Sequence, residues 1–103
     1  MIIEIFDKEL ESLINHKYIG KYKPYRSNEK FKRNLDKVIR FLINANDIIE
    51  VSKNYSLHYE RLKGQPYSSV RVGYDTKYRL IFEEYEDKIT LELIEINEHY
   101  GDH

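Results

Sequence analysis

The feature that most constrains the fold is a series of short alternating segments between residues 57 and 96, separated by tight turns. Gly64-Gln65-Pro66 follows a segment at residues 57–62, and further turns at residues 73–77 and 86–88 separate the rest. Alternation of apolar and polar residues is typical of a strand with one buried face. Because the turns are short, consecutive strands run antiparallel, and the pattern predicts a β-meander.

The last predicted strand changes phase near its end. Ile89, Leu91 and Leu93 share one parity, whereas Ile94 and Ile96 have the other. One extra residue in a strand shifts every later side chain to the opposite face. The pattern therefore predicts a β-bulge, or a strand buried on both faces near its end.

A short strand and a helix are predicted at the start of the chain. Residues 2–5 alternate as a strand, and apolar residues then recur at helical spacing up to Tyr18. Asp7 is expected to be the N-cap of this helix and Gly20 to end it. A basic loop at residues 21–27 follows, where a proline prevents continuation of the helix.

The second helix has the clearest pattern in the chain. Ser27 or Asn28 is expected to cap it, and its apolar stripe recurs at i, i+4, i+7, i+8 and i+11. The stripe consists of Phe31, Leu35, Val38, Ile39 and Leu42. Asn46-Asp47 then turns the chain, and residues 52–56 read as a loop. The sequence predicts one α+β domain over residues 1–103, a short N-terminal strand and two helices that pack on one face of an antiparallel meander.

Length and composition agree with a single domain. The chain has 103 residues, of which 41% are hydrophobic and 34% are charged, and it has no cysteine. Disulfides and thiolate metal sites are therefore excluded. The N-terminus lacks the basic region of a signal peptide, and no apolar run approaches the roughly 18 residues that span a bilayer. We expect a cytoplasmic protein with no membrane partner.

The charges are distributed unevenly, although the net charge is only −1. Residues 17–40 contain nine Lys or Arg and two acids, whereas residues 83–103 contain eight acids and one lysine. A local excess of cations attracts polyanions such as nucleic acids even when the whole chain is nearly neutral. Two well-solvated faces would produce the same pattern, so both interpretations stay open.

Three motifs in the second half together resemble a known family. They are Leu-Lys-Gly at residues 62–64, Tyr-Ser-Ser-Val-Arg-Val at residues 67–72, and Tyr-Arg-Leu-Ile-Phe at residues 78–82. With the acidic apolar strand that follows, their order is similar to the RelE/ParE toxin superfamily, and most similar to its HigB-like killer-protein branch. The resemblance implies a RelE/ParE-like fold and the toxin of a type II toxin-antitoxin system. It also implies a cognate antitoxin as partner, often a helix-turn-helix protein.

The resemblance further implies a ribosome-dependent mRNA endonuclease that needs no metal or other cofactor. Such an enzyme uses the 2′-hydroxyl of RNA as nucleophile, so it needs a proton acceptor, a proton donor and cations for the phosphoryl oxygens. By similarity, the catalytic candidates come from the hairpin and from the end of the chain. They are Arg71, Arg79, Glu98, His99 and Tyr100.

The candidates for RNA and phosphate binding lie in the predicted strand at residues 57–62, in the turn that follows it and in the next hairpin. They are His58, Glu60, Lys63, Tyr67 and Tyr74. Tyrosine rings stack on bases, and Lys63 is a compact cation for a phosphate. Structural roles are the alternative: Arg79 could pair with a sheet carboxylate such as Glu92, and His58 could be a half-buried strand residue. A metal site is not expected, because no tight ligand spacing supports one.

Two other functions fit the same resemblance. ParE-type members of the superfamily inhibit DNA gyrase without being enzymes, and a degenerate member would only bind its antitoxin. The motifs do not distinguish these from ribosome-dependent cleavage of mRNA, so all three stay open at this point.

Overall fold

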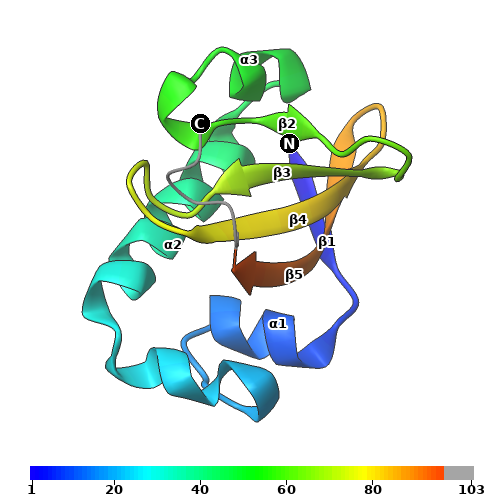
Figure 1. Cartoon of the computed structure of the whole chain (residues 1–103). Helices are drawn as coiled ribbons and strands as arrows, with labels where there is room; N and C mark the ends of the chain where they lie inside the picture. Colours follow the sequence, from blue (N-terminus) through cyan, green and yellow to red (C-terminus); the bar gives the residue numbers. More distant parts are fainter. Residues whose placement is uncertain (97–103) are drawn as a thin grey trace.

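The computed structural model describes residues 1–96, and its five strands form one mixed sheet in the order β1-β5-β4-β3-β2 (Figure 1). The elements are, in chain order, β1 Ile2–Ile5, α1 Lys8–Ile14, the 3-10 helix η1 Gly20–Ser27, α2 Glu29–Asn44, α3 Ile48–Ser52, the 3-10 helix η2 Tyr55–Leu57, β2 Glu60–Arg61, β3 Tyr67–Arg71, β4 Tyr78–Glu84 and β5 Lys88–Ile96. The predicted α+β class is confirmed.

The predicted meander is confirmed as well. Strands β2, β3, β4 and β5 pair antiparallel in chain order. β1 lies at the edge of the sheet and runs parallel to β5, with Ile3 opposite Ile89 and Ile5 opposite Leu91. A parallel pair needs a long crossover connection, which residues 6–87 provide here.

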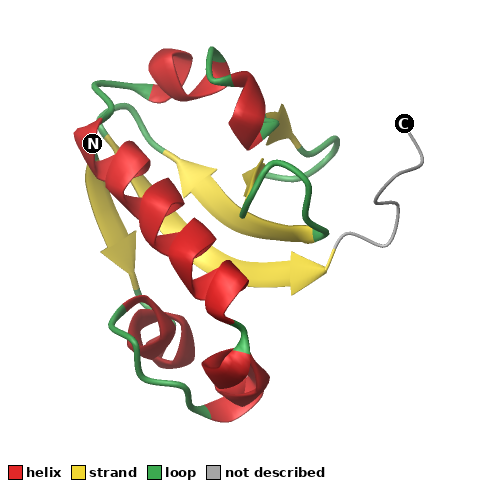
Figure 2. Cartoon of the chain, turned by 90° about the vertical axis from the view of Figure 1, so that its left-hand side faces the viewer, coloured by secondary structure: helices red, strands yellow, loops and turns green. Residues whose placement is uncertain are grey.

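The helices cover one face of the sheet, and Figure 2 shows α2 lying across it. The buried stripe of α2 packs there against the inward side chains of β3, β4 and β5, among them Val70, Leu80 and Phe82, which have no exposed surface. Side chains of opposite parity, including those of Arg79 and Ile81, point to the other face. We call that second face the open face, because within residues 1–96 the helices pack on the first.

Both predicted helix starts are confirmed by capping hydrogen bonds. The Asp7 carboxylate accepts from the Leu10 backbone nitrogen at 2.9 Å, and the Asn28 side-chain oxygen accepts from the Phe31 nitrogen at 3.0 Å. Each bond satisfies a backbone donor that has no partner inside the helix. Of the two candidate caps for α2, the structure selects Asn28.

The predicted end of the first helix was wrong. α1 ends at Ile14, because His16 has a left-handed φ of 65°. The His16 and Lys17 nitrogens donate back to the Leu13 and Ser12 carbonyls, which is the Schellman termination. The basic segment after Gly20 is the 3-10 helix η1 rather than a loop.

Two helices were predicted, and the structure has further short ones before β2. The Asp47 carboxylate caps α3 by accepting from the Glu50 nitrogen, and Asn54 caps η2 by accepting from the Ser56 nitrogen. The strand predicted at residues 57–62 is accordingly reduced to the two residues of β2. His58 adopts a left-handed φ of 47°, which a strand does not tolerate.

The predicted bulge is confirmed in β5. Ile81 of β4 lies opposite Leu93, but the next residue, Phe82, lies opposite Leu91, so Glu92 is the extra residue. Because of this shift, Leu91 and Ile94 both reach the helix-covered core.

None of the helices within residues 1–96 has the length and hydrophobicity of a membrane-spanning helix.

Candidate nucleic-acid interface

The open face carries a hollow of about 360 Å³ between the β2–β3 turn and strands β4 and β5. We call it the sheet hollow. Its wall combines cations, carboxylates, an aromatic ring and apolar side chains. The lining residues are Leu62, Lys63, Gln65, Tyr67, Arg79, Ile81, Glu92, Leu93 and Glu95.

Three residues predicted from the sequence meet in the sheet hollow. Arg79 comes from the central strand β4, Tyr67 begins β3, and Lys63 lies in the turn before it. Lys63 is exposed, and its ammonium has no hydrogen bond or ion pair within residues 1–96. Glu60 shares the open face, because it lies opposite Ser69, and Ser69 lies opposite Ile81.

Arg79 is held by a carboxylate of the neighbouring strand. Its Nε donates to Glu95 Oε1 at 2.8 Å, and its Nη2 lies 2.6 Å from the same oxygen. The structural role that the sequence offered as an alternative is therefore present, but the partner is Glu95 and not Glu92. The pair is partly exposed, with relative accessibilities of 22% for the Arg79 side chain and 38% for that of Glu95.

Glu92 enters the sheet hollow because of the β-bulge. Without the extra residue, Glu92 and Leu93 would point to opposite faces, yet both line the hollow. The Glu92 carboxylate accepts no hydrogen bond from residues 1–96. The phase change in the sequence predicted the bulge but not the face to which it would turn this carboxylate.

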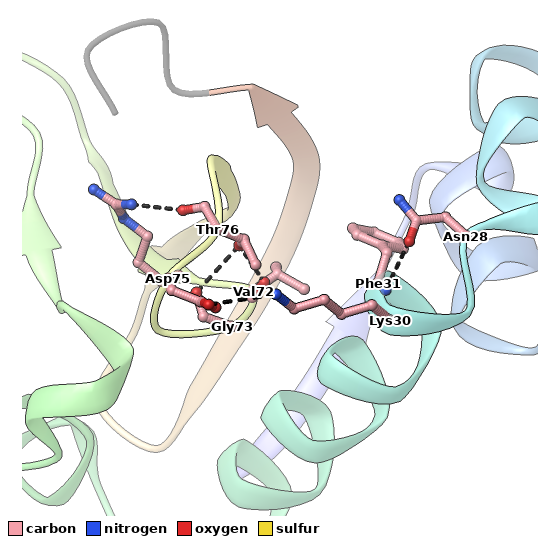
Figure 3. Close-up of polar contacts among 8 residues, drawn as sticks. Asn28, Lys30, Phe31, Val72, Gly73, Asp75 and Thr76 are labelled. Carbon is pink, nitrogen blue, oxygen red and sulfur yellow. Dashed lines mark hydrogen bonds and ion pairs between the residues drawn. The ribbon is translucent and has the colours of Figure 1, made fainter. Parts of the chain in front are cut away.

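Arg71 has a different position from the other predicted cations. It lies directly opposite Arg79 in the sheet, but it is only 7% exposed, and its Nη1 donates to the Thr76 carbonyl at 2.6 Å. Thr76 in turn donates through its hydroxyl to the Val72 carbonyl at 2.5 Å (Figure 3). Arg71 therefore fixes the loop between β3 and β4, whichever other role it has.

His58 and Tyr74 do not reach the sheet hollow. Their rings lie together, with centroids 5.4 Å apart and planes tilted by 40°, beside the β3–β4 loop. His58 is exposed rather than half-buried. Of the predicted RNA-binding residues, Lys63 and Tyr67 therefore line the sheet hollow and Glu60 shares its face. His58 and Tyr74 form a separate group beside the β3–β4 loop.

The three candidates near the end of the chain, Glu98, His99 and Tyr100, lie outside the described residues. Their proposed roles stay predictions that rest on the family resemblance. Among residues 1–96 no group of three or more His, Asp or Glu side chains is arranged to hold a metal ion.

A polar cluster that the sequence did not indicate lies on the helix side of the sheet. The Tyr59 and Ser68 hydroxyls both donate to the Glu84 carboxylate, and Arg61 Nη1 lies 3.5 Å from the same oxygen. Burial and the hydrogen bond to Glu84 raise the pKa of the Tyr59 hydroxyl above its usual value of 10. Ser68 has no exposed surface, so the cluster is a structural tie between strands.

The basic segment of the sequence forms the η1 and α2 layer, on the opposite side of the sheet from the hollow. Lys32 pairs with Glu29 at 2.9 Å and Lys30 with Asp75 at 3.4 Å, and most other cations of the layer are exposed. The sheet hollow itself has two cations, Lys63 and Arg79, and two carboxylates. Its local charge is therefore balanced rather than strongly positive.

Comparisons with known proteins do not identify this chain. No protein-family model matches it, and no curated protein is significantly similar to it.

Proposed function

We propose that this chain is the toxin of a type II toxin-antitoxin system and cuts mRNA on the ribosome. The observation that supports this function best is the sheet hollow, where Lys63, Arg79 and Tyr67 lie together on an open β-sheet face. The element order of strand, helices and meander also agrees with the RelE/ParE-like arrangement that the three motifs suggest. An mRNA on the ribosome as substrate implies a cytoplasmic protein.

In this proposal the hollow receives one phosphodiester and an adjacent base. The Arg79 guanidinium and the Lys63 ammonium face the phosphoryl oxygens, and the Tyr67 ring stacks on the base. Metal-independent cleavage has the 2′-hydroxyl attack phosphorus while the bond to the 5′-oxygen breaks. The proton leaves the 2′-oxygen for a base and a proton reaches the 5′-oxygen from an acid, which gives a 2′,3′-cyclic phosphate and a free 5′-hydroxyl.

A specific observation favours a second candidate, a module that binds an antitoxin and has no activity. Both predicted phosphate-binding arginines have protein partners, Arg79 with Glu95 and Arg71 with the Thr76 carbonyl. A phosphate must compete with Glu95 for Arg79, and Arg71 is almost fully buried. The resemblance also allows a third function, inhibition of DNA gyrase. One experiment distinguishes all three functions.

The test is induced expression of the chain without a partner, followed by primer extension on several mRNAs. The proposed function predicts growth arrest and cuts at defined positions in translated messages. Arrest with intact mRNA and lost DNA supercoiling would establish the gyrase function, and unimpaired growth would establish the inactive module. Either result contradicts the proposal.

Variants connect this outcome to the sheet hollow. We expect Arg79→Gln and Lys63→Ala to lower cleavage by at least roughly tenfold, since each removes a charge-assisted contact to phosphate. Lys53→Ala is the matched control, because Lys53 is an exposed lysine just after α3, away from the hollow. Circular dichroism and thermal unfolding establish that each variant is folded. Equal cleavage by all three variants would contradict a role of the hollow.

A further inference from the structure

A second hollow, of about 260 Å³, lies on the helix side between α2, η2 and the β3–β4 loop. We call it the α2 groove. Apolar side chains contribute to its lining, among them Val38, Phe41 and Leu57. Its polar lining includes Asn34 and Lys37 from α2 and Tyr74 from the loop.

The β3–β4 loop that forms one wall of the α2 groove is held in place. Gly73 has a φ of 97°, a backbone conformation that favours glycine, and a Cβ atom there would lie 2.4 Å from the Asn34 side-chain nitrogen and 2.9 Å from Thr76 Cγ2. Lys30 and Asp75 pair across the same junction at 3.4 Å (Figure 3). The groove is therefore preformed, and a ligand needs no ordering of this loop.

The polar groups of the groove are available to a ligand. The Asn34 amide has no hydrogen-bond partner within residues 1–96, and neither has the Lys37 ammonium. The Tyr74 side chain is exposed, with a relative accessibility of 65%, and the His58 ring supports it from one side. These three groups match the parts of a nucleotide. A side-chain amide hydrogen-bonds the edge of a base, an aromatic ring stacks on its face, and a cation contacts the phosphate.

We propose that the α2 groove binds one unpaired base of single-stranded RNA. Tyr74 stacks on the base, Asn34 hydrogen-bonds its edge, and Lys37 contacts the phosphate. The inference rests on the proposed function, because it extends the same RNA strand. The two sites lie on opposite faces of the sheet, so an RNA strand that occupies both passes around the edge strand β2.

The lining favours a base over an acidic peptide segment. A peptide rich in Asp or Glu would need several cations, and Lys37 is the only cation among the described residues that line the groove. An apolar floor with one unpaired amide suits a flat heterocycle that offers donors and acceptors at its edge.

Fluorescence anisotropy with a labelled short oligoadenylate tests the proposal on the full chain. We expect Tyr74→Ala and Asn34→Ala each to weaken binding by roughly fivefold or more. Tyr55→Ala is the matched control, since Tyr55 is 89% exposed and does not line the groove, and it should bind like the unaltered protein. Urea unfolding establishes that each variant is folded.

The outcomes separate this inference from the proposed function. If Arg79→Gln loses RNA binding while Tyr74→Ala and Asn34→Ala bind normally, the α2 groove is not a base site, although the sheet hollow still is. If the chain cuts no mRNA in cells but adenosine 5′-monophosphate still shifts the Asn34 side-chain amide resonances, the base site stands and the proposed function fails. Protection of Tyr74 by a protein partner, with no effect of the variants on RNA binding, also overturns the inference.

Discussion

Arg79 and Glu95 lie directly opposite each other on β4 and β5, and the Arg79 guanidinium binds the Glu95 carboxylate through two nitrogens, at 2.8 and 2.6 Å. This ion pair lies in the sheet hollow, where the proposed function requires Arg79 to meet a phosphate. Glu95 thus holds the guanidinium in position and at the same time competes with an anionic ligand.

The first prediction follows from this competition. We expect Glu95→Gln to bind a short RNA oligonucleotide roughly threefold or more tightly, because the phosphate no longer displaces a carboxylate from Arg79. The slope of log affinity against log salt concentration should become steeper by about one. Glu86→Gln removes the same charge in the exposed β4–β5 turn and is the control. Equal affinities of both variants would show that Glu95 does not compete.

The second prediction compares two glycines with left-handed backbones. Gly73→Ala adds a Cβ atom that meets Asn34, whereas a Cβ atom added at Gly64, which has a φ of 72°, would have no heavy atom within 4 Å. Gly64→Ala should therefore lower the unfolding free energy only by the cost of a left-handed alanine, about 1 kcal/mol. Gly73→Ala should lower the unfolding free energy by clearly more than that. Urea unfolding measures both. Adding Asn34→Ala to Gly73→Ala should recover part of the loss, and no recovery would contradict the steric contact.

The third prediction concerns the pH dependence of stability at the Tyr59–Glu84 contact. Burial and this hydrogen bond raise the pKa of Tyr59 above 10 in the folded protein, so the folded state holds the hydroxyl proton more tightly than the unfolded state does. The stabilisation is complete below pH 10 and is lost as the pH rises through the folded pKa. Unfolding free energies measured across this range should fall less steeply for Tyr59→Phe.

Other tyrosines set the background of this experiment, and one further variant is its control. Burial also raises the pKa values of Tyr22 and Tyr25, so a residual slope persists in Tyr59→Phe. Tyr55→Phe removes the hydroxyl of a tyrosine that is 89% exposed and controls for the loss of a tyrosine hydroxyl as such. An unchanged slope in Tyr59→Phe would show that the contact with Glu84 does not stabilise the protonated hydroxyl.

The fourth prediction tests the N-cap of α2. Asn28→Ala removes the acceptor of the Phe31 nitrogen and should lower the unfolding free energy by about 1 kcal/mol, whereas Asn28→Asp should preserve it. Thermal and urea unfolding measure the difference. Asn44→Ala, at the exposed C-terminal end of the same helix, should change the stability by less than about 0.5 kcal/mol. Equal effects at both ends would argue against a specific cap.

The sequence by itself determined the elements that depend on neighbouring residues. The apolar stripe predicted α2, short turns predicted the meander, and the phase change between Leu93 and Ile94 predicted the bulge. Side-chain caps such as Asp7 were predictable for the same reason, since the acceptor and its donor are three residues apart. Short-range signals failed at His58, where a left-handed residue replaced the start of a predicted strand.

Only the tertiary structure decided which residues of the candidate sites meet. It placed β1 beside β5, paired Arg79 with Glu95 and turned Glu92 into the sheet hollow. Each of these contacts depends on strand register or on packing between segments far apart in the chain, and a one-residue shift in register changes every partner and every face. The periodicity of one segment holds no information about the register of another, so the sequence supplied the candidate residues and the fold divided them between two sites.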